Sequence, residues 1–292
     1  MESPPPLLSP RPHLLAPSLK TEKLALMESE WELYSIKERW GEIDGVHMFL
    51  YTSLVYLRNK TEFWTARVPG RYPSREALPP AAAPSCGTLQ HVDRTHLFPA
   101  LDPGIHRCDD VDEAEKAGIF VKRVHVDAYD GSPTLARYVA HEALICQRLR
   151  SYPHPNLARF RGCHVAPGGT GAGGEILGLC FDKYAETLAE RMRRGAAVDT
   201  ERCMEQIRAA LRHLHGLQLV HNDVVPDNVM FVNDGPGLVL IDFDSCATRG
   251  GGLPRKRGPV RPGATRSEFE NDDLGLRLIH RALLRYEHDT RS

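Results

Sequence analysis

Several features are absent from this chain of 292 residues, and each absence excludes a class of protein. Its seven cysteines contain no C-x-x-C pair, so the sequence predicts neither a zinc site nor a disulfide framework. The longest apolar run, near residues 48–57, is far shorter than the ~20 residues that span a bilayer. No signal peptide is recognisable. Together these absences predict a reducing compartment, cytoplasmic or nuclear.

An excess of charge of one sign is also lacking, because the formal net charge is only −1. A balanced charge gives no electrostatic reason to expect binding to nucleic acid or to an acidic membrane surface. Hydrophobic residues make up 41% of the chain and charged residues 26%, which is typical of a folded globular protein. The length is sufficient for about two domains.

The N-terminal part changes character twice. Residues 1–18 are proline-rich and are predicted to be disordered, because such a segment cannot form a packed helix or a central strand. Residues 19–68 are predicted to form a helical extension, either a cap on the main domain or an independent binding module. Four apolar residues recur there at steps of three and four: Leu24, Met27, Trp31 and Tyr34. A linker rich in proline and alanine, residues 69–87, follows.

From residue 88 the hydrophobic pattern alternates between strand and helix. Strands are predicted at residues 118–124, 176–181, 217–220, 229–232 and 238–241, and helices at residues 134–150 and 200–216. Strands come first and helices later, which favours an α+β fold with two lobes.

The most informative motif is His221-Asn222-Asp223-Val224-Val225-Pro226-Asp227-Asn228, of the form H-x-D-x-x-x-x-N. Two short predicted strands follow, and then Ile241-Asp242-Phe243-Asp244. Asp223 can take a proton from a hydroxyl, and Asn228 and Asp242 offer the hard oxygen ligands that Mg²⁺ prefers. The two motifs, in this order and at this distance, predict a phosphotransfer centre.

These motifs resemble those of the protein kinase superfamily over about residues 88–287, and most of all its divergent, shortened members common in fungi. The resemblance implies a kinase-like fold with a small, mostly β N-lobe (about 88–180). A hinge (about 181–184) and a truncated, mostly helical C-lobe (about 185–287) would follow. It also implies an ATP- and Mg²⁺-dependent protein kinase, which transfers phosphate to serine or threonine hydroxyls of a protein substrate.

The resemblance assigns a role to each matching residue. Asp223 is implied as the catalytic base, and Asn228 and Asp242 as metal ligands. Lys122, in an apolar strand, is implied to hold the α- and β-phosphates, with Glu142 on the next helix as its partner. Taken singly, Lys122 and Glu142 would each be read first as a surface charge, but the apolar neighbours of Lys122 and the stretch His154-Pro155-Asn156 after Glu142 favour the paired role.

Other family positions are matched more loosely. The hinge, whose backbone contacts adenine, is implied at four residues: Phe181, Asp182, Lys183 and Tyr184. His221 is implied as a structural residue of the catalytic loop. Asp272 resembles a buried aspartate that braces the backbone of this loop, with a simple helix cap as the alternative.

Four features depart from the kinase pattern. No glycine-rich loop precedes Lys122, and the G-x-G-x-x-G at residues 169–174 follows it, where we interpret it as a hairpin loop. Asn222 stands where the family has an arginine that pairs with an activation-segment phosphate. Val225 replaces a lysine that contacts the γ-phosphate, and Asp244 replaces a glycine.

The activation-segment equivalent, residues 245–266, is short. Its basic run, Arg255-Lys256-Arg257, is interpreted as solvated, with a nuclear localisation signal as the alternative. Because Asn222 replaces the arginine, we expect activity that does not depend on phosphorylation of this segment.

Two alternatives stay open. One is a kinase-like pseudoenzyme that binds nucleotide or a partner without turnover, and the missing glycine-rich loop, Val225 and the short C-lobe support it. The other is a small-molecule kinase, because both motifs also resemble those of the choline and aminoglycoside kinase families. The stretch His154-Pro155-Asn156, which follows the helix with Glu142, favours the protein kinase side.

Overall fold

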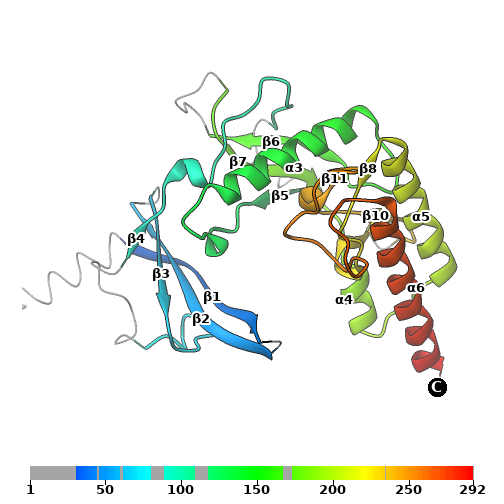
Figure 1. Cartoon of the computed structure of the whole chain (residues 1–292), viewed down its shortest axis with the longest axis horizontal. Helices are drawn as coiled ribbons and strands as arrows, with labels where there is room; N and C mark the ends of the chain where they lie inside the picture. Colours follow the sequence, from blue (N-terminus) through cyan, green and yellow to red (C-terminus); the bar gives the residue numbers. More distant parts are fainter. Residues whose placement is uncertain are drawn as a thin grey trace, which may run out of the picture. The chain divides into compact units, whose positions relative to one another are not determined.

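The computed structural model describes residues 31–44, 46–59, 62–79, 89–108, 118–166, 173–233 and 235–291. The chain divides into two compact units, Met1–Arg94 and Thr95–Ser292, each with its own sheet. Figure 1 labels their helices and strands. The proline-rich tail predicted at residues 1–18 lies outside the described residues.

The first unit contains an antiparallel sheet with the strand order β1-β2-β3-β4. Its strands are β1 (Trp31–Ile43), β2 (Val46–Arg58), β3 (Glu62–Val68) and β4 (Gln90–His91). Leu54, Ala66 and Val68 form a small buried core, and partly buried side chains of β1 pack against it. This sheet therefore carries its own hydrophobic cluster.

The helix predicted over residues 19–68 is wrong wherever the structure describes them, because β1, β2 and β3 occupy this stretch. The step from Trp31 to Tyr34 imitates a helical period. The first residues of β1 nevertheless alternate between partly buried and exposed, as in a strand. The missed signal is Asp44-Gly45, since Asp-Gly between two hydrophobic runs favours a hairpin. Asp44 has the left-handed φ of 52° that such turns use.

Between β3 and β4, the described residues 69–79 contain no helix or strand. They belong to the segment predicted as a linker, residues 69–87. The contacts within the structure divide the chain after Arg94. The domain start at residue 88 stays a prediction.

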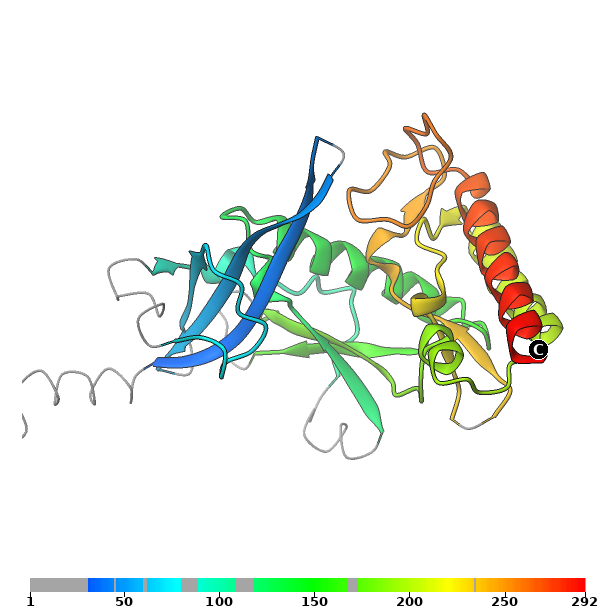
Figure 2. The ribbon, with the colours of Figure 1, turned by 90° about the horizontal axis from the view of Figure 1, so that it is seen from below.

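The second unit begins with a three-stranded antiparallel sheet and a long helix that packs on it (Figures 1 and 2). The strands β5 (Ile119–Arg123), β6 (Phe160–Val165) and β7 (Ile176–Asp182) have the order β5-β7-β6. Helix α3 (Thr134–Ser151) buries Ala143, Cys146 and Leu149. It ends just before Pro153, as predicted, because proline cannot continue a helix.

The rest of the second unit is mostly helical, with α4 (Leu188–Arg193), α5 (Thr200–Gly216) and α6 (Phe269–Arg291). Strand β8 (Leu219–Val220) pairs with β11 (Ala247–Thr248), and β9 (Val229–Phe231) pairs with β10 (Leu238–Leu240). Short 3₁₀ turns lie at Arg94–His96, Val126–Ala128, Pro226–Asn228 and Phe243–Ser245. Helix α5 buries the apolar face that its sequence predicts: Met204, Ile207, Leu211 and Leu214.

The second unit has a β-rich N-terminal lobe and a short helical C-terminal lobe, which confirms the predicted α+β class. One hydrophobic core runs through both lobes, from Leu149 and Phe160 to Leu214, Phe243 and Ile279. A shared core of this kind fixes the loops between β8 and α6 relative to the sheet. Among the described residues, no helix combines the length and apolar character needed to cross a membrane.

Candidate active site

The loop between β8 and β9 brings its own acid and amide together. The side-chain Nδ2 of Asn228 donates to the backbone oxygen of Asp223 at 2.9 Å and to its carboxylate Oδ2 at 3.0 Å. Pro226 begins the 3₁₀ turn that carries Asn228, and its fixed φ suits the first turn position. Because Asp223 engages the amide nitrogen, the amide oxygen of Asn228 is the atom that can ligate a metal ion.

A buried carboxylate on α6 fixes the backbone of this loop. Asp272 is 0% exposed and accepts hydrogen bonds from the N–H groups of His221, at 2.9 Å, and Asn222, at 2.8 Å. Nε2 of His215 lies 2.8 Å from the same carboxylate. The bracing role that the resemblance implies for Asp272 is therefore confirmed.

The side chain of His221 connects the two motifs through hydrogen-bonding contacts with their backbone. Its Nδ1 accepts from the backbone N–H of Asp223 at 3.2 Å, and its Nε2 lies 3.0 Å from the backbone oxygen of Ile241. Both bonds are satisfied by a neutral imidazole that carries its proton on Nε2. The side chain is fully buried and holds the loop beside the strand that leads to Asp242.

Asn222, the residue in place of the family's arginine, forms a network of amides and hydroxyls. Its Nδ2 donates to the backbone oxygen of Ser245 at 3.1 Å and to Oγ of Ser267 at 3.0 Å, and its Oδ1 accepts from Asn271 at 3.0 Å. Its φ of 61° is left-handed, a region that asparagine tolerates well. That activity is independent of phosphorylation of residues 245–266 stays a prediction. Hydrogen bonds between uncharged groups nevertheless connect Ser245 and Ser267 with Asn222 in the loop between β8 and β9.

The second motif meets the first through the main chain. The N–H of Ile241 donates to the backbone oxygen of Asn228 at 2.9 Å, so the residue before Asp242 is bonded to the predicted metal ligand of the loop. Asp242 itself has a left-handed φ of 65°, which is uncommon for a residue other than glycine. Such backbone outliers concentrate at functional sites, where the surrounding structure holds them in place.

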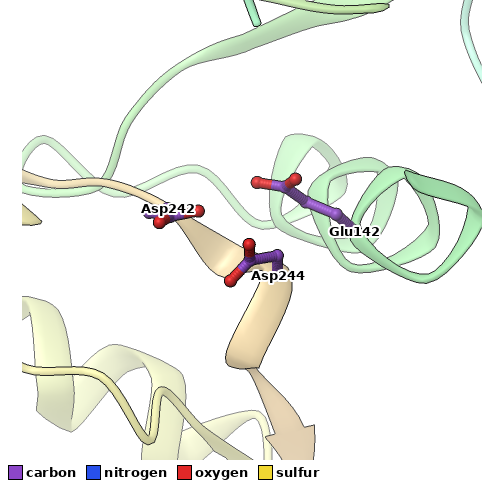
Figure 3. Close-up of side chains that lie close together, drawn as sticks. All are labelled: Glu142, Asp242 and Asp244. Atoms are coloured by element: carbon purple, nitrogen blue, oxygen red, sulfur yellow. The ribbon is translucent and has the colours of Figure 1, made fainter. Parts of the chain in front are cut away.

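Lys122 connects α3 with the segment after β10. Its Nζ lies 2.7 and 2.8 Å from the two carboxylate oxygens of Glu142, and 2.5 Å from Oδ1 of Asp242. Figure 3 shows that the carboxylates of Glu142, on α3, and of Asp242 and Asp244, on the segment after β10, face one another. The reading of Lys122 and Glu142 as surface charges is wrong, because Glu142 is buried and Lys122 is bound to two carboxylates.

Lys256 completes this charged cluster, although the sequence did not single it out. Its Nζ lies 2.8 Å from Oδ2 of Asp242 and 2.5 Å from Oδ2 of Asp244. Lys256 is half-exposed, as expected of a solvated run, but its ammonium group also binds two carboxylates, which the sequence did not predict. The signal that could have found it is Asp244, an added acid beside Asp242 that offers a cation a second partner.

The charged groups of the cluster shift the pKa values of one another. Burial alone would lower the pKa of Lys122, but the charges of Glu142, Asp242 and Asp244 outweigh it and raise the pKa above the usual lysine value. Burial alone would also raise the pKa of Asp242, but Lys122 and Lys256 outweigh it and hold the pKa below the usual range. Lys122 and Asp242 are thus both charged at neutral pH.

Asp223 lies in a different environment. Burial raises its pKa above the usual aspartate value, and the hydrogen bond from Asn228 and the charge of Lys256 oppose this shift without cancelling it. A carboxylate with a raised pKa holds a proton more readily than an exposed aspartate does. The site therefore contains two aspartates whose environments move their pKa values in opposite directions, a pattern typical of acid–base sites.

A cavity of ≈ 410 Å³ lies beside the charged cluster. Its walls include all four predicted hinge residues and the three residues Lys122, Glu142 and Asp242. The remaining lining is mostly apolar: Phe120, His125, Ala158, Met230 and Ile241. Asp223 and Asn228 are the two predicted site residues that do not line it. A second cavity, of ≈ 930 Å³, contacts none of the charged cluster.

The backbone of the hinge is partly engaged. The N–H of Lys183 donates to the oxygen of Gly118 at 2.9 Å, and the N–H of Asp182 donates to the oxygen of Arg159 at 3.1 Å. No described residue accepts a bond from the N–H of Tyr184. Among the predicted hinge residues, Tyr184 therefore offers a backbone donor that the described part of the chain does not use.

The donor set suits a hard divalent cation. One carboxylate oxygen from each of Glu142, Asp242 and Asp244 lies within 4.8 Å of the others. Carboxylate oxygens, together with an amide oxygen such as that of Asn228, are ligands that Mg²⁺ accepts. Two ammonium groups already bind the Asp242 carboxylate, which shows that this position stabilises positive charge.

The glycine-rich stretch at residues 169–174 connects β6 with β7, two antiparallel neighbours, as the hairpin interpretation predicts. Residues 169–172 lie outside the described residues. Because the stretch follows Lys122 and leads into β7, it does not stand in the position of a loop that would precede the lysine strand.

Comparison with known proteins agrees with this geometry at a coarse level. A model of the phosphotransferase enzyme family (APH) matches residues 154–248, less than half of the chain but including the loop His221–Asn228 and Asp242. No curated protein matches the chain. The solved structures to which the chain is similar include the kinase PK-1 of the Cydia pomonella granulovirus, at 12% identity and a TM-score of 0.40. The similarity covers 92% of this chain and 73% of that chain. A TM-score of this size carries no argument, whereas the family match and the site geometry support a kinase-like phosphotransferase.

Proposed function

We propose that this protein is an ATP- and Mg²⁺-dependent phosphotransferase that acts on serine or threonine hydroxyls of a protein substrate. The observation that carries this proposal is the linkage of three residues with complementary chemistry. The amide of Asn228 binds the Asp223 carboxylate at 3.0 Å, and its backbone binds the residue before Asp242 at 2.9 Å. An acid and two metal ligands tied together in this way are the parts that phosphoryl transfer requires.

ATP would occupy the cavity beside the hinge. Its volume of ≈ 410 Å³ is within the usual range for ligand pockets, and the apolar surfaces of Ala158, Met230 and Ile241 suit a purine ring. The unused N–H of Tyr184 would donate to a ring nitrogen. Lys122, oriented by Glu142, would contact the α- and β-phosphates.

Asp242 and Asn228 would hold Mg²⁺, which when bound neutralises charge on the phosphates. The lowered pKa of Asp242 keeps this carboxylate ionised across the physiological range. Glu142 is engaged on both oxygens by Lys122, so its role is to orient the lysine. Asp223 would orient the acceptor hydroxyl and take its proton, a contribution of about 10²- to 10⁴-fold to the rate.

A second candidate acceptor is the hydroxyl of a small molecule. The specific observation in its favour is the match of residues 154–248 to the phosphotransferase enzyme family. A small-molecule acceptor would need the same base, metal ligands and nucleotide cavity, so the two candidates differ in the acceptor and not in the phosphotransfer centre.

The test is ADP release from Mg²⁺-ATP, measured with casein, choline or kanamycin as the acceptor. Asp223→Ala should lower transfer by about 100-fold or more while nucleotide binding is retained, and Asp242→Asn should weaken Mg²⁺-ATP binding. Asp227→Ala is the matched control, since Asp227 is an exposed acid of the same loop. Transfer to choline or kanamycin but not to casein would select the small-molecule acceptor.

Two results would overturn the proposal. Nucleotide binding without any Asp223-dependent transfer would identify a pseudoenzyme. Equal loss of nucleotide binding in Asp223→Ala and Asp242→Asn would show that the base and the metal ligand are wrongly assigned.

A further inference from the structure

Lys256 lies where the proposed function would place the reacting groups. Its Nζ contacts Asp242, the proposed metal ligand, at 2.8 Å, and Asp244 at 2.5 Å. Its position does not depend on this side chain, because the backbone is bound independently. Oγ of Ser245 donates to the backbone oxygen of Lys256 at 2.9 Å.

The chain just after Lys256 lies directly against the catalytic loop. The N–H of Gly258 donates to the backbone oxygen of Asn222 at 3.0 Å. A Cβ at Gly258 would come within 2.7 Å of Oδ1 of Asp223 and 3.3 Å of the side chain of Val225, so a glycine is needed for this approach. The segment thus passes over the proposed base and over Val225, and it brings Lys256 to the side of Asp242.

The side chain of Lys256 can move while its backbone stays bound. It is 51% exposed, whereas Asp242 and Asp244 are 18% and 14% exposed. A lysine with a bound backbone and a half-exposed, flexible side chain can leave a carboxylate for a nearby phosphate. If Asp242 gave one oxygen to a metal ion, the ammonium group of Lys256 would lose part of its present site and become available.

We propose that Lys256 contacts the phosphoryl group that is transferred, and that it supplies the positive charge that Val225 cannot supply from the catalytic loop. This inference rests on the proposed function. In the step itself the acceptor oxygen forms a bond to the γ-phosphorus, and the bond from this phosphorus to the β,γ-bridging oxygen breaks. ADP leaves with the electron pair, and Asp223 takes the hydroxyl proton. Lys256 stabilises the negative charge on the phosphoryl oxygens during this transfer.

The opposite reading is that Lys256 blocks the metal site and holds the enzyme inactive. The two hypotheses predict opposite changes in kcat when Lys256 is replaced. Removal of a blocking lysine would raise kcat, whereas removal of a lysine that stabilises the transferred phosphoryl group would lower it. The backbone bonds of Ser245 and Gly258 favour the first reading, because they hold the segment to the loop without help from the ammonium group.

The test is steady-state ADP release from Mg²⁺-ATP by the full chain and by Lys256→Met, with Arg255→Ala as a matched control. Arg255 is an exposed neighbour, so the control removes one positive charge from the same run. We expect Lys256→Met to lower kcat by about 100-fold with less than about a threefold change in KM for ATP. Lys256→Arg should retain more than Lys256→Met, and Arg255→Ala should match the wild type.

A charge-relocation variant provides a second measurement. Val225→Lys combined with Lys256→Met should recover at least about tenfold of the lost kcat, because the lysine would approach the phosphate from the loop. An unchanged or raised kcat in Lys256→Met would overturn the inference. So would equal losses in Lys256→Met and Lys256→Arg. If Asp223→Ala is as active as the wild type, the proposed function itself fails, which distinguishes the two failures.

Discussion

The catalytic loop and the charged cluster lie side by side, but different forces hold them. The loop, His221–Asn228, is positioned mainly by bonds to backbone N–H and C=O groups, with Asp272 as its buried anchor. The cluster around Asp242 is held by ammonium–carboxylate pairs that join four segments of the chain. Backbone bonds fix geometry, whereas ion pairs on long side chains can exchange partners when a new charge arrives.

This difference separates the part of the site that must be rigid from the part that must respond. A base has to stand at a fixed distance from its acceptor, and a network of buried hydrogen bonds provides this. Under the proposed function, the groups that would contact nucleotide and metal have to rearrange during each turnover. The contrast leads to predictions in which the two parts respond differently to substitution.

We expect the largest loss of stability when the loop His221–Asn228 loses the buried carboxylate of Asp272. Asp272→Ala leaves two buried N–H groups, of His221 and Asn222, without an acceptor. We expect the free energy of unfolding to fall by about 3 kcal/mol or more, together with activity. Urea denaturation measures this change, and Asp273→Ala is the control because Asp273 is an exposed neighbour on α6. Equal stability of the two variants would show that the loop does not depend on Asp272.

The responsive part should lose function before stability. In Glu142→Gln, the amide oxygen can still accept from Lys122, which also keeps Asp242 as a partner, and burial already disfavours the ionised carboxylate by raising the pKa of Glu142. The free energy of unfolding should therefore fall by only about 1 kcal/mol. We expect kcat/KM for ATP to fall by about 10- to 100-fold, because Lys122 is no longer oriented toward the phosphates. Glu205→Gln, an exposed acid on α5, serves as the control. A loss of stability comparable with that of Asp272→Ala would remove the distinction between the two parts.

Asn222 tests whether the uncharged network holds the segment after Asp242. Asn222→Ala removes its side-chain bonds and also places alanine at a φ of 61°, whereas Asn222→Gly removes the bonds but tolerates the backbone. We expect losses of about 2 kcal/mol for alanine and about 1 kcal/mol for glycine in thermal or urea unfolding. If both variants are as stable as the wild type, the network contributes nothing to the fold.

The smallest predicted effect is a shift in pH dependence. Asp223 must be ionised to act as a base, so kcat is lost as pH falls through its pKa. Because burial raises this pKa, the acid limb of kcat should lie above the ~3.9 of a free aspartate. Asp242, whose pKa is lowered, should not contribute a limb in this range. A profile that stays flat down to pH ~4 would contradict the role of Asp223.

The sequence predicted well those features that depend on local spacing. Asp223 and Asn228 belong to one short loop, and the strands that lead to Asp242 have clear apolar patterns. The motif was therefore sufficient to predict that these three residues lie close together. The apolar face of α5 followed equally from its helical period.

The features that sequence analysis missed depend on contacts between residues whose spacing in the sequence gives no signal. The period from Trp31 to Tyr34 fits a helix, and only the Asp44-Gly45 turn reveals the hairpin of the first unit. Lys256 lies in a basic run of the kind that is usually solvated, and its contact with Asp242 depends on how an irregular segment folds back across the loop. No periodicity describes such a segment, so its contacts had to come from the structure.

The amide and hydroxyl bonds of Asn222 also have a consequence for how the protein is made. If activity is independent of phosphorylation, as we predict, the segment held by these asparagine and serine side chains is complete as soon as the chain has folded. We therefore expect a bacterial host, without any upstream kinase, to yield a fully formed site.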